Sequence, residues 1–417
     1  MKWHAKGLWN SGDFVKLWIG HTISNFGNGI TGLALPLTAI LVLSATPVQM
    51  GLLSALSSIS IVVFGLLAGV WIDRLRRRPI LITADLGRAL LLGSLPLAAL
   101  LGVLRLEQIY VVSALTGILS VFFNVADESF LPSLIPQEQL VEANSKLGMS
   151  DALAEISGPA SAGPLIQLAG APFAIVFDAI SFLLSALSIG LIRTPEPQPL
   201  PMKQRQSAWR ESIEGLRMIR ENALLRALAI SAALFNFFGN FIGTLYVLYI
   251  VREVHAAPLV IGLLVATGGI SALVGTIIAQ RVIQRIGPGM AIGGMLSLYG
   301  LTGILIPLAH DPLSVAVALL FTAQLFGDAS VAIYLIAEVS LRQAIIPNAF
   351  LGRVNASMQF LTQGVGPGAA ILAGVVGSLI GMRLTIFIGV LGVIFAGNWL
   401  LVSPVRRVRS FERNSLS

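Results

Sequence analysis

The sequence predicts an all-α membrane protein with twelve transmembrane helices in two pseudosymmetric six-helix bundles. Of its 417 residues, 55% are hydrophobic and only 11% are charged, whereas about a quarter of the residues in a soluble domain are charged. Apolar segments of about 20 residues, the length that crosses a ~30 Å hydrocarbon core as a helix, recur along the chain. A pattern of scarce polar residues also occurs twice, at a constant spacing.

Taken in order, the apolar segments are helices rather than strands, because a membrane-spanning strand needs only about 10 residues. The first follows the basic start MKWHAK and is too long for the core of a signal peptide, so we expect it to remain as the first span. The predicted spans are residues 15–43, 50–72, 79–104, 108–131, 141–169, 172–192, 223–251, 258–284, 288–309, 312–340, 350–380 and 382–403.

Basic residues gather in alternate loops, such as the one from Arg74 to Arg78 and the one from Lys203 to Arg226. The positive-inside rule places these loops, and with them both termini, in the cytoplasm. We interpret the net charge of +7 as a topology signal in a multi-pass membrane protein. Nucleic-acid binding is not expected from it.

The chain divides at a Pro-rich connection, RTPEPQPLP, which cannot be helical throughout. After it, Trp209, Ile213 and Leu216 recur at helical spacing among charges, which indicates an amphipathic helix on the membrane surface. The predicted domains are an N-terminal bundle (1–192), a cytoplasmic linker (193–222), a C-terminal bundle (223–405) and a basic tail (406–417).

The two bundles repeat each other at an offset of 211 residues. Shared hydrophobicity does not explain this register, because it pairs scarce residue types. The pairs include Asn25 and Asn236, Gly32 and Gly243, Arg74 and Arg285, Asp127 and Glu338, and Pro136 and Pro347. Two six-helix repeats that begin on the same side are related by an axis along the membrane normal, an arrangement found in transporters that work by alternating access.

Glycines within this repeat carry two further expectations. Gly32 and Gly243 are expected to be sites of close helix approach, because Gly lets backbones meet. The Gly-Pro pairs that begin at Gly158 and Gly366 differ by 208 rather than 211, so we expect that about three residues have been lost before Gly366.

The segment GVWIDRLRRRP, residues 69–79, resembles the loop signature between the second and third spans of the major facilitator superfamily. The matching residues are Gly69, Asp73, Arg74, Arg77 and Arg78. Arg76 stands where the family has Gly, and the second copy keeps Arg285 but has Gln284 in place of Asp. The resemblance covers the whole chain and implies the major facilitator fold. It also implies a gating role for this loop, with Arg77 or Arg78 reaching Asp127 or Glu128.

In the fifth span, SGPASAGPL resembles the antiporter signature of drug exporters, with Ala162 in place of one Gly. Together with ADLGRALL and FLGRVNASM, it makes the chain similar to the branch of macrolide, multidrug and siderophore efflux proteins. The resemblance implies proton-coupled export of a lipophilic drug or a siderophore-like compound. The alternatives are a lysolipid or metabolite carrier of the same fold, and a receptor or scaffold that transports nothing.

Carboxylates inside the spans are the first candidates for proton coupling, because an Asp at a helix centre costs about 2.5–3.5 kcal/mol on insertion scales. Asp151 and Glu155 lie one turn apart on the fifth span, and Asp328 lies near the middle of the tenth. For Asp127 and Glu338 we expect salt bridges that hold one state closed. Structural roles are expected for Asp85, Arg88, Asp178 and His21.

Polar and aromatic residues on the spans that line the cavity in this fold are candidates for substrate contact, and hydrogen bonding between helices is the alternative for the amides. These candidates are Asn25, Asn28, Asn236, Asn240, Phe26, Phe237 and Tyr334. Gly and Pro weaken a helix and permit bends. Bends are expected at Gly158, Pro159, Gly163, Gly366 and Pro367.

Other classes of function lack a motif. The chain has no cysteine, which excludes disulfides and thiolate metal sites. It has no P-loop, zinc-protease motif or accessible Ser-His-Asp arrangement. We therefore expect no enzyme activity, no cofactor and no metal, and an ion gradient as the energy source. The expected state is a monomer whose partners are a small lipophilic substrate, protons and the lipid bilayer.

Overall fold

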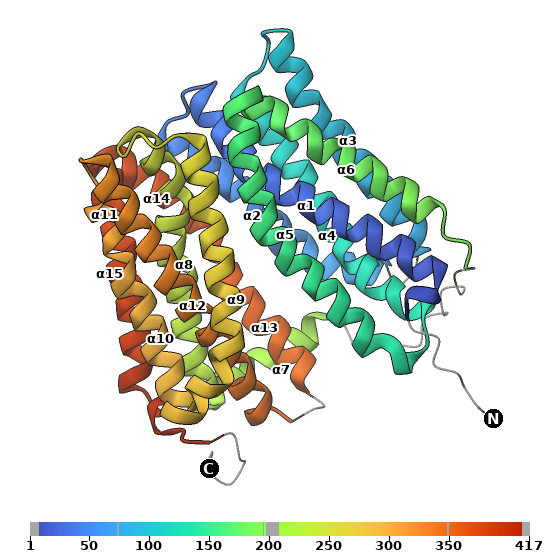
Figure 1. The fold of residues 1–417 in the computed structure, drawn as a ribbon. Helices are drawn as coiled ribbons and strands as arrows, with labels where there is room; N and C mark the ends of the chain where they lie inside the picture. Colours follow the sequence, from blue (N-terminus) through green and yellow to red (C-terminus); the bar gives the residue numbers. More distant parts are fainter. Residues whose placement is uncertain (1–7, 73–74, 195, 197–207, 348–349, 411–417) are drawn as a thin grey trace, which may run out of the picture. The chain divides into compact units, whose positions relative to one another are not determined.

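The computed structural model describes residues 8–72, 75–194, 196, 208–347 and 350–410 (Figure 1). Within these ranges every regular element is a helix, which confirms the predicted all-α fold class. Asp73 and Arg74, two residues of the loop signature, lie outside the described residues. The chain divides into two compact units, one formed by Met1–Ala45 with Leu56–Pro201 and the other by Thr46–Ala55 with Met202–Ser417.

The first unit is built from six long helices, with α2 extending into the second unit at its start. Their bounds are α1 Gly12–Leu41, α2 Pro47–Ile72, α3 Arg77–Leu100, α4 Leu106–Leu134, α5 Leu140–Ala169 and α6 Ala171–Gly190. Helix α1 packs against both α5 and α6, and α3 packs against α4 and α6. Figure 1 shows α1, α3 and α6 side by side. The core at one end of this unit surrounds Phe14 and Phe130.

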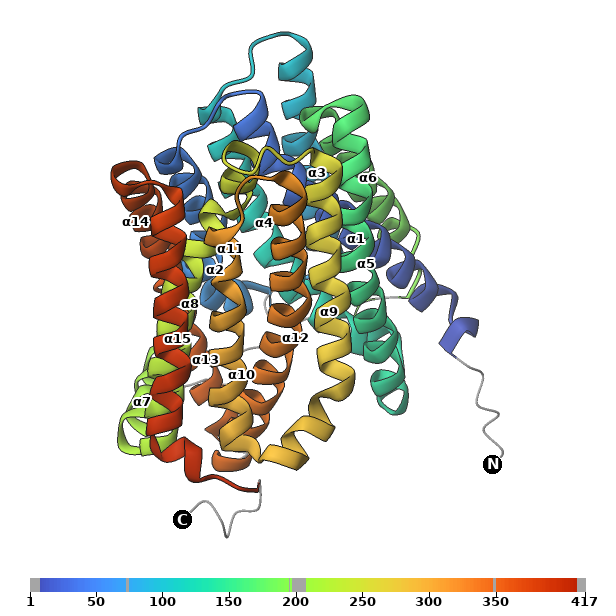
Figure 2. The same ribbon diagram turned by 60° about the vertical axis from the view of Figure 1, so that its left-hand side comes forward.

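The second unit repeats this packing. Its helices are α7 Ala208–Glu221, α8 Ala223–Arg252, α9 Pro258–Ile286, α10 Pro288–Gly303, α11 Leu305–Leu308, α12 Leu313–Ile345, α13 Leu351–Gln363, α14 Gly366–Ile380 and α15 Met382–Val402. Helix α8 packs against α14 and α15, and α10 packs against α12 and α15, as Figure 2 shows for α10 and α15. The linker helix α7 joins this unit through α13, where the backbone of Gly215 meets that of Arg353.

Ten helical segments of the described chain are long and apolar enough to cross a membrane, counting α10 with α11 and α13 with α14 as one each. Helices α1 and α5 have 30 residues each and are long enough as well, but they carry polar side chains such as His21 and Asp151. These two helices correspond to the remaining two of the twelve predicted spans. Together with α4 they build the site described below.

The helix bounds follow the predicted repeat. Helix α8 begins and ends 211 residues after α1, and α14 and α5 end at the same offset. A side-chain contact repeats as well: Ser60 Oγ donates a hydrogen bond to the carbonyl of Ala114, and Ser271 Oγ donates one to the carbonyl of Leu325. Each of these four atoms is related to its counterpart by 211 residues, so the two units share one helix-packing scheme.

The expected loss of three residues before Gly366 is wrong. Helix α5 spans Leu140–Ala169, and α13 and α14 together span Leu351–Ile380, at an offset of 211 at both ends. Gly170 and Gly381, the next residues, share a left-handed backbone with φ of 94° and 89°. The Gly-Pro pair of the second copy therefore lies one helical turn earlier than that of the first, because the motif has moved and the chain has not shortened.

The expected close approaches at Gly32 and Gly243 are also wrong, since a Cβ added at either would meet nothing within 4 Å among the described residues. Helices α1 and α5 instead approach at Gly29 and Gly158, where a Cβ on Gly158 would lie 2.7 Å from the Gly29 Cα. Only glycine fits there, because the obstructing atoms belong to the backbone.

Candidate functional site

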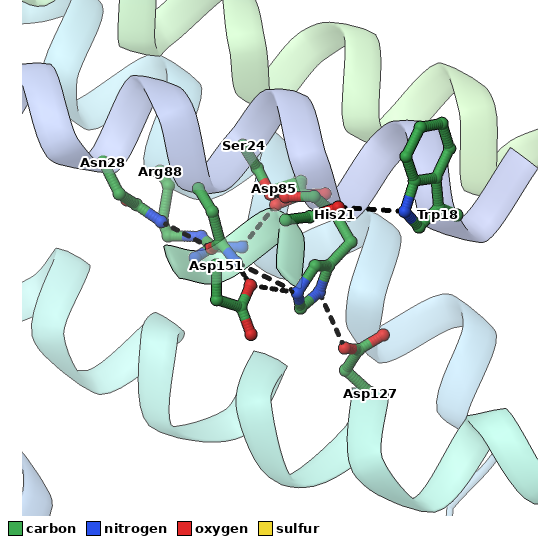
Figure 3. A network of polar contacts seen from close by, with 10 residues as sticks. Trp18, His21, Ser24, Asn28, Asp85, Arg88, Asp127 and Asp151 are labelled. Carbon is green, nitrogen blue, oxygen red and sulfur yellow. Dashed lines mark hydrogen bonds and ion pairs between the residues drawn. The ribbon is translucent and has the colours of Figure 1, made fainter. Parts of the chain in front are cut away.

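Three ionisable side chains of the first unit meet at His21, two turns into α1 (Figure 3). Its Nδ1 atom lies 3.1 Å from Oδ2 of Asp127 on α4, and its Nε2 atom lies 2.7 Å from Oδ1 of Asp151 on α5. The imidazole ring thus lies between two carboxyl groups and links three helices. We call His21, Asp127 and Asp151 the histidine cluster.

Asn25, one turn after His21, completes the polar face of α1. Its amide Nδ2 donates a 2.6 Å hydrogen bond to Oδ1 of Asp151, the oxygen that His21 also contacts. Asn28 in turn lies 3.5 Å from the Asn25 side-chain oxygen. Below this face Trp18 donates to the hydroxyl of Ser150 at 2.9 Å. Trp18, His21 and Asn25 therefore join α1 to α5 over about two turns of α1.

The glycine contact between α1 and α5 explains why a short aspartate reaches the imidazole. Gly29 and Gly158 hold the two backbones in contact, and His21 and Asp151 lie two turns from that point on the same two helices. Burial across the cluster is graded. The side chain of Asp151 is 49% exposed, whereas His21 and Asp127 are 15% and 11% exposed. One carboxylate faces outward and the other faces the interior of the unit.

The histidine cluster is suited to binding protons and poorly suited to binding a metal. A neutral imidazole has one N–H and one lone pair, and here both ring nitrogens face carboxyl oxygens. Either the ring is protonated or one carboxyl group is. A metal ion binds a ring nitrogen of histidine directly, and here each ring nitrogen already faces a carboxyl oxygen. The described residues contain no group of three or more His, Cys, Asp or Glu placed to hold a metal ion.

A second charged group is buried deeper in the first unit. Arg88 of α3 contacts Asp85 of the same helix as an ion pair, and both side chains are buried. The guanidinium lies between two aromatic rings, 4.2 Å from the centroid of Phe123 and 4.1 Å from that of Phe182. Such stacking favours Arg over Lys. The predicted pairing of Asp85 with Arg88 is therefore present.

Asp178 of α6 belongs to the same buried region, as predicted for a packing residue. Its side chain is fully buried, and Oδ1 accepts a 3.0 Å hydrogen bond from the Ser181 hydroxyl. Gly27 of α1 leaves the space for both side chains, because a Cβ there would collide with them. The contact between α1 and α6 is thus polar in the first unit.

The other proton-coupling candidates lie apart from the histidine cluster. Glu155 is an exposed residue of α5. Asp328 of α12 is half-buried, and its carboxylate lies against the backbone of Gly268 on α9. The structure therefore brings Asp151 together with other ionisable groups, and it places Asp328 in the second unit, against α9.

The gating candidates have partners other than those expected. Arg77 lies 3.9 Å from Glu196, and Arg78 donates to the carbonyl of Gly190, so neither contacts Asp127 or Glu128. The reason is that Glu196 caps the start of α3 and Asp127 turns to His21. Glu338 pairs with Arg342 of its own helix at 3.4 Å. Arg285 and Gly69 lie near the ends of α9 and α2.

The predicted cavity residues of the second unit make contacts with side chains and carbonyls close to them in the sequence or in the same unit. Asn236 and Asn240 donate to backbone carbonyls one turn earlier on α8, at 2.9 and 2.8 Å. Phe237 packs on neighbouring rings of α8, and the buried Tyr334 packs on Phe235. In the first unit Phe26 is half-buried and Asn28 is exposed.

The expected bends differ between the copies. Helix α5 continues without a break through Gly158, Pro159 and Gly163, whereas the second copy is interrupted between Gln363 and Gly366, just before Pro367. Two site residues were given only structural roles by the sequence, His21 and Arg88. A signal for His21 was present: Asn25 follows it by one helical turn, so two polar side chains share a face of an otherwise apolar span.

Comparison with known proteins gives a family match. Residues 17–366 match the Major Facilitator Superfamily. Macrolide efflux protein A of Streptococcus pyogenes is 25% identical over 54% of this chain and 55% of that protein, and Enterobactin exporter EntS of Citrobacter koseri is 24% identical over 95% and 93%. The chain spans little more than half the length of several curated relatives that it matches, such as 55% of the macrolide efflux protein.

The fold is also found among solved structures. A bacterial homologue of the iron transporter ferroportin, crystallised in the inward-facing state, superposes with a TM-score of 0.72 at 19% identity, covering 95% of this chain and 99% of that one. At this level of identity the likeness concerns the fold.

Proposed function

The chain belongs to the Major Facilitator Superfamily, and on this premise we propose that it exports a small lipophilic compound in exchange for protons. The matched relatives and solved neighbours are transporters, not enzymes. The single observation that supports proton coupling is the histidine cluster, in which one imidazole contacts two carboxyl groups on two other helices. Apolar spans keep such groups only at a cost of several kcal/mol, about 2.5–3.5 for each Asp at a helix centre.

The geometry of the histidine cluster favours one proton more than a neutral ring and two carboxylates would hold. With a neutral ring and two carboxylates, one contact would set a nitrogen lone pair against a carboxylate lone pair, which is repulsive. One additional proton removes the repulsion. Histidine is the side chain whose ordinary pKa lies nearest neutral pH, which makes it the side-chain type best suited to carry such a proton. Among the described residues Asp127 Oδ1 has no hydrogen-bond partner, which leaves an acceptor for it.

The gradient of exposure suggests a direction for the proton. Asp151 is half exposed and exchanges protons with water, His21 relays them, and Asp127 is the buried end. Each protonation step changes the attraction between α1 and its neighbours α4 and α5. Loading of the cluster is thereby linked to the packing of α1, a helix at the centre of the first unit. Asp328, in the second unit, is the candidate for contact with the exported compound.

The class of compound follows from the relatives by analogy. One is named for macrolide efflux and another for enterobactin export, so drugs and siderophore-like compounds are the first choices. We place both termini in the cytoplasm, in keeping with the basic loops, and the chain as a monomer in a bacterial plasma or inner membrane.

Everted membrane vesicles test the proposal, because an exporter takes its substrate up into them. Labelled macrolides, siderophores and lipophilic cations are offered with and without an acid-inside proton gradient. We expect uptake of at least one class that collapses when the gradient is dissipated. Uptake that ignores the gradient, or no difference from vesicles without the protein for any class, would refute the proposal.

A further inference from the structure

A cavity of ≈ 600 Å³ lies in the first unit, where α3 begins and the chain leaves α6. It is lined by Arg76, Arg78, Pro79, Ile82, Thr83, Arg193, Thr194 and Glu196. The volume is that of a small-molecule site, for which about 300–1,000 Å³ is usual. The cavity is separate from the histidine cluster and shares no residue with it.

The charge of this cavity is strongly unbalanced. Three arginines and one glutamate line it, and the glutamate carboxylate is already engaged. Glu196 accepts hydrogen bonds from the backbone N–H groups of Arg77 and Arg78, at 2.5 and 3.3 Å, and so satisfies the first donors of α3. The side chains of Arg76 and Arg193 are exposed, and neither forms a salt bridge within the part of the chain that the structure describes. Among the described lining residues, positive charge is therefore in excess.

The walls of the cavity are fixed by contacts of their own. Asp13, at the start of α1, accepts hydrogen bonds from the backbone N–H groups of Arg193 and Thr194, at 3.1 and 2.8 Å, and one of 2.6 Å from the Thr194 hydroxyl. Arg78 donates to the carbonyl of Gly190, at the end of α6. Three helix ends are thus held together, and the guanidinium groups project from an anchored backbone.

We propose that this cavity binds a phosphate group. Guanidinium pairs recognise phosphate through parallel, bidentate hydrogen bonds, and phosphate supplies the negative charge that the lining lacks. The site lies at the ends of membrane-spanning helices, the depth at which lipid headgroups are found. The phosphate therefore comes either from an anionic phospholipid or from a soluble phosphate ester, and both offer the same group to the same arginines.

Ligand-induced thermal stabilisation of the purified protein in neutral detergent tests this site, because a ligand that binds only the folded state raises the melting temperature. The probes are short-chain phosphatidylglycerol, short-chain phosphatidylcholine, glycerol 1-phosphate and inorganic phosphate. We expect saturable stabilisation by phosphatidylglycerol. Its affinity should fall about tenfold or more in Arg76→Gln/Arg193→Gln, since two charge-assisted contacts are lost. Thr83→Trp fills the cavity without changing its charge and is expected to weaken binding too.

A matched control removes the same charge elsewhere. Arg281→Gln/Arg285→Gln changes two exposed arginines at the end of α9, outside this cavity, and should bind like the wild type. Stabilisation by the soluble phosphates assigns the site to a phosphate ester, and stabilisation by phosphatidylglycerol alone assigns it to a lipid headgroup. Equal loss in both double variants, or no saturable stabilisation by any probe, would overturn the proposal. The assay measures binding only, so its outcome is independent of the transported compound.

Discussion

At the residue scale, the two copies of the repeat differ most around His21. Its counterpart at the 211-residue offset is Ala232, and the counterpart of Asp151 is Thr362. Asn25 and Asn236 occupy one position of the repeat, yet Asn25 donates to Asp151 and Asn236 to its own helix. At these two positions the first unit has ionisable side chains, while the second copy keeps the amide and has Thr362 in place of its acidic partner.

The buried ion pair supports a prediction about stability. Arg88→Met removes the cation that pairs with Asp85, so a buried carboxylate loses its ion-pair partner. We expect a loss of about 3–5 kcal/mol in the free energy of unfolding, measured by denaturant titration in detergent. The double variant Arg88→Met/Asp85→Leu removes both charges and should recover much of that loss. A single variant as stable as the wild type would show that the pair is not coupled.

How much of the site the sequence could predict depends on the residue. Asp151 was a candidate because a carboxylate in a span is costly, and spacing within one helix identified Asp85 with Arg88. His21 was assigned a packing role because its two partners, Asp127 and Asp151, are more than 100 positions away. Contacts between helices depend on how each helix is rotated and how closely it approaches, and neither is encoded in one span.

At the element scale, the helices pack through small residues that alternate between copies. In the first unit Gly27 of α1 makes room for Asp178 on α6. In the second unit Phe238 of α8, at the equivalent position, packs on Gly389 and Gly392 of α15. Large and small partners have been exchanged across the same crossing, which conserves volume. Periodicity predicts helix existence, but such an exchange cannot be predicted from either span alone.

The crossing of α1 with α5 supports a prediction that distinguishes a glycine at a close backbone approach from a glycine with free space beside it. Gly158→Ala places a methyl group 2.7 Å from the Gly29 Cα, so the helices must separate, and we expect a loss of about 1–3 kcal/mol in unfolding free energy. The matched variant Gly32→Ala adds the same methyl group where nothing lies within 4 Å, and should be neutral or slightly stabilising. Thermal unfolding of both variants checks this, and equal destabilisation would contradict it.

At the scale of the whole molecule, the repeat was predictable because a constant offset survives in scarce residues. Shared helix bounds and the shared Ser60 and Ser271 hydrogen bonds agree with it. The moved Gly-Pro motif was misread as a deletion, since a short motif can shift by one turn without any change in chain length. The lengths of the helices decide between a deletion and a shifted motif. The apolar segments of the sequence define those lengths only to within a few residues.

The absence of cysteine makes the predicted orientation directly testable, because a single introduced thiol has no background. Leu101→Cys, in the exposed turn after α3, should react with an impermeant maleimide added to intact cells. Arg409→Cys, exposed after the last helix, should react only after permeabilisation. The reverse pattern would invert the topology, and labelling of both from one side would contradict the number of spans.

The central claim is that the histidine cluster carries the exchanged proton. The most direct test compares Asp151→Asn with Glu155→Gln, two neutral substitutions one turn apart on α5, in vesicles that hold a compound exported by the wild type. We predict that Asp151→Asn abolishes transport driven by a pH gradient but retains exchange of labelled for unlabelled compound at equal pH, and that Glu155→Gln retains both. Full gradient-driven transport in Asp151→Asn, or its loss only in Glu155→Gln, would contradict the account.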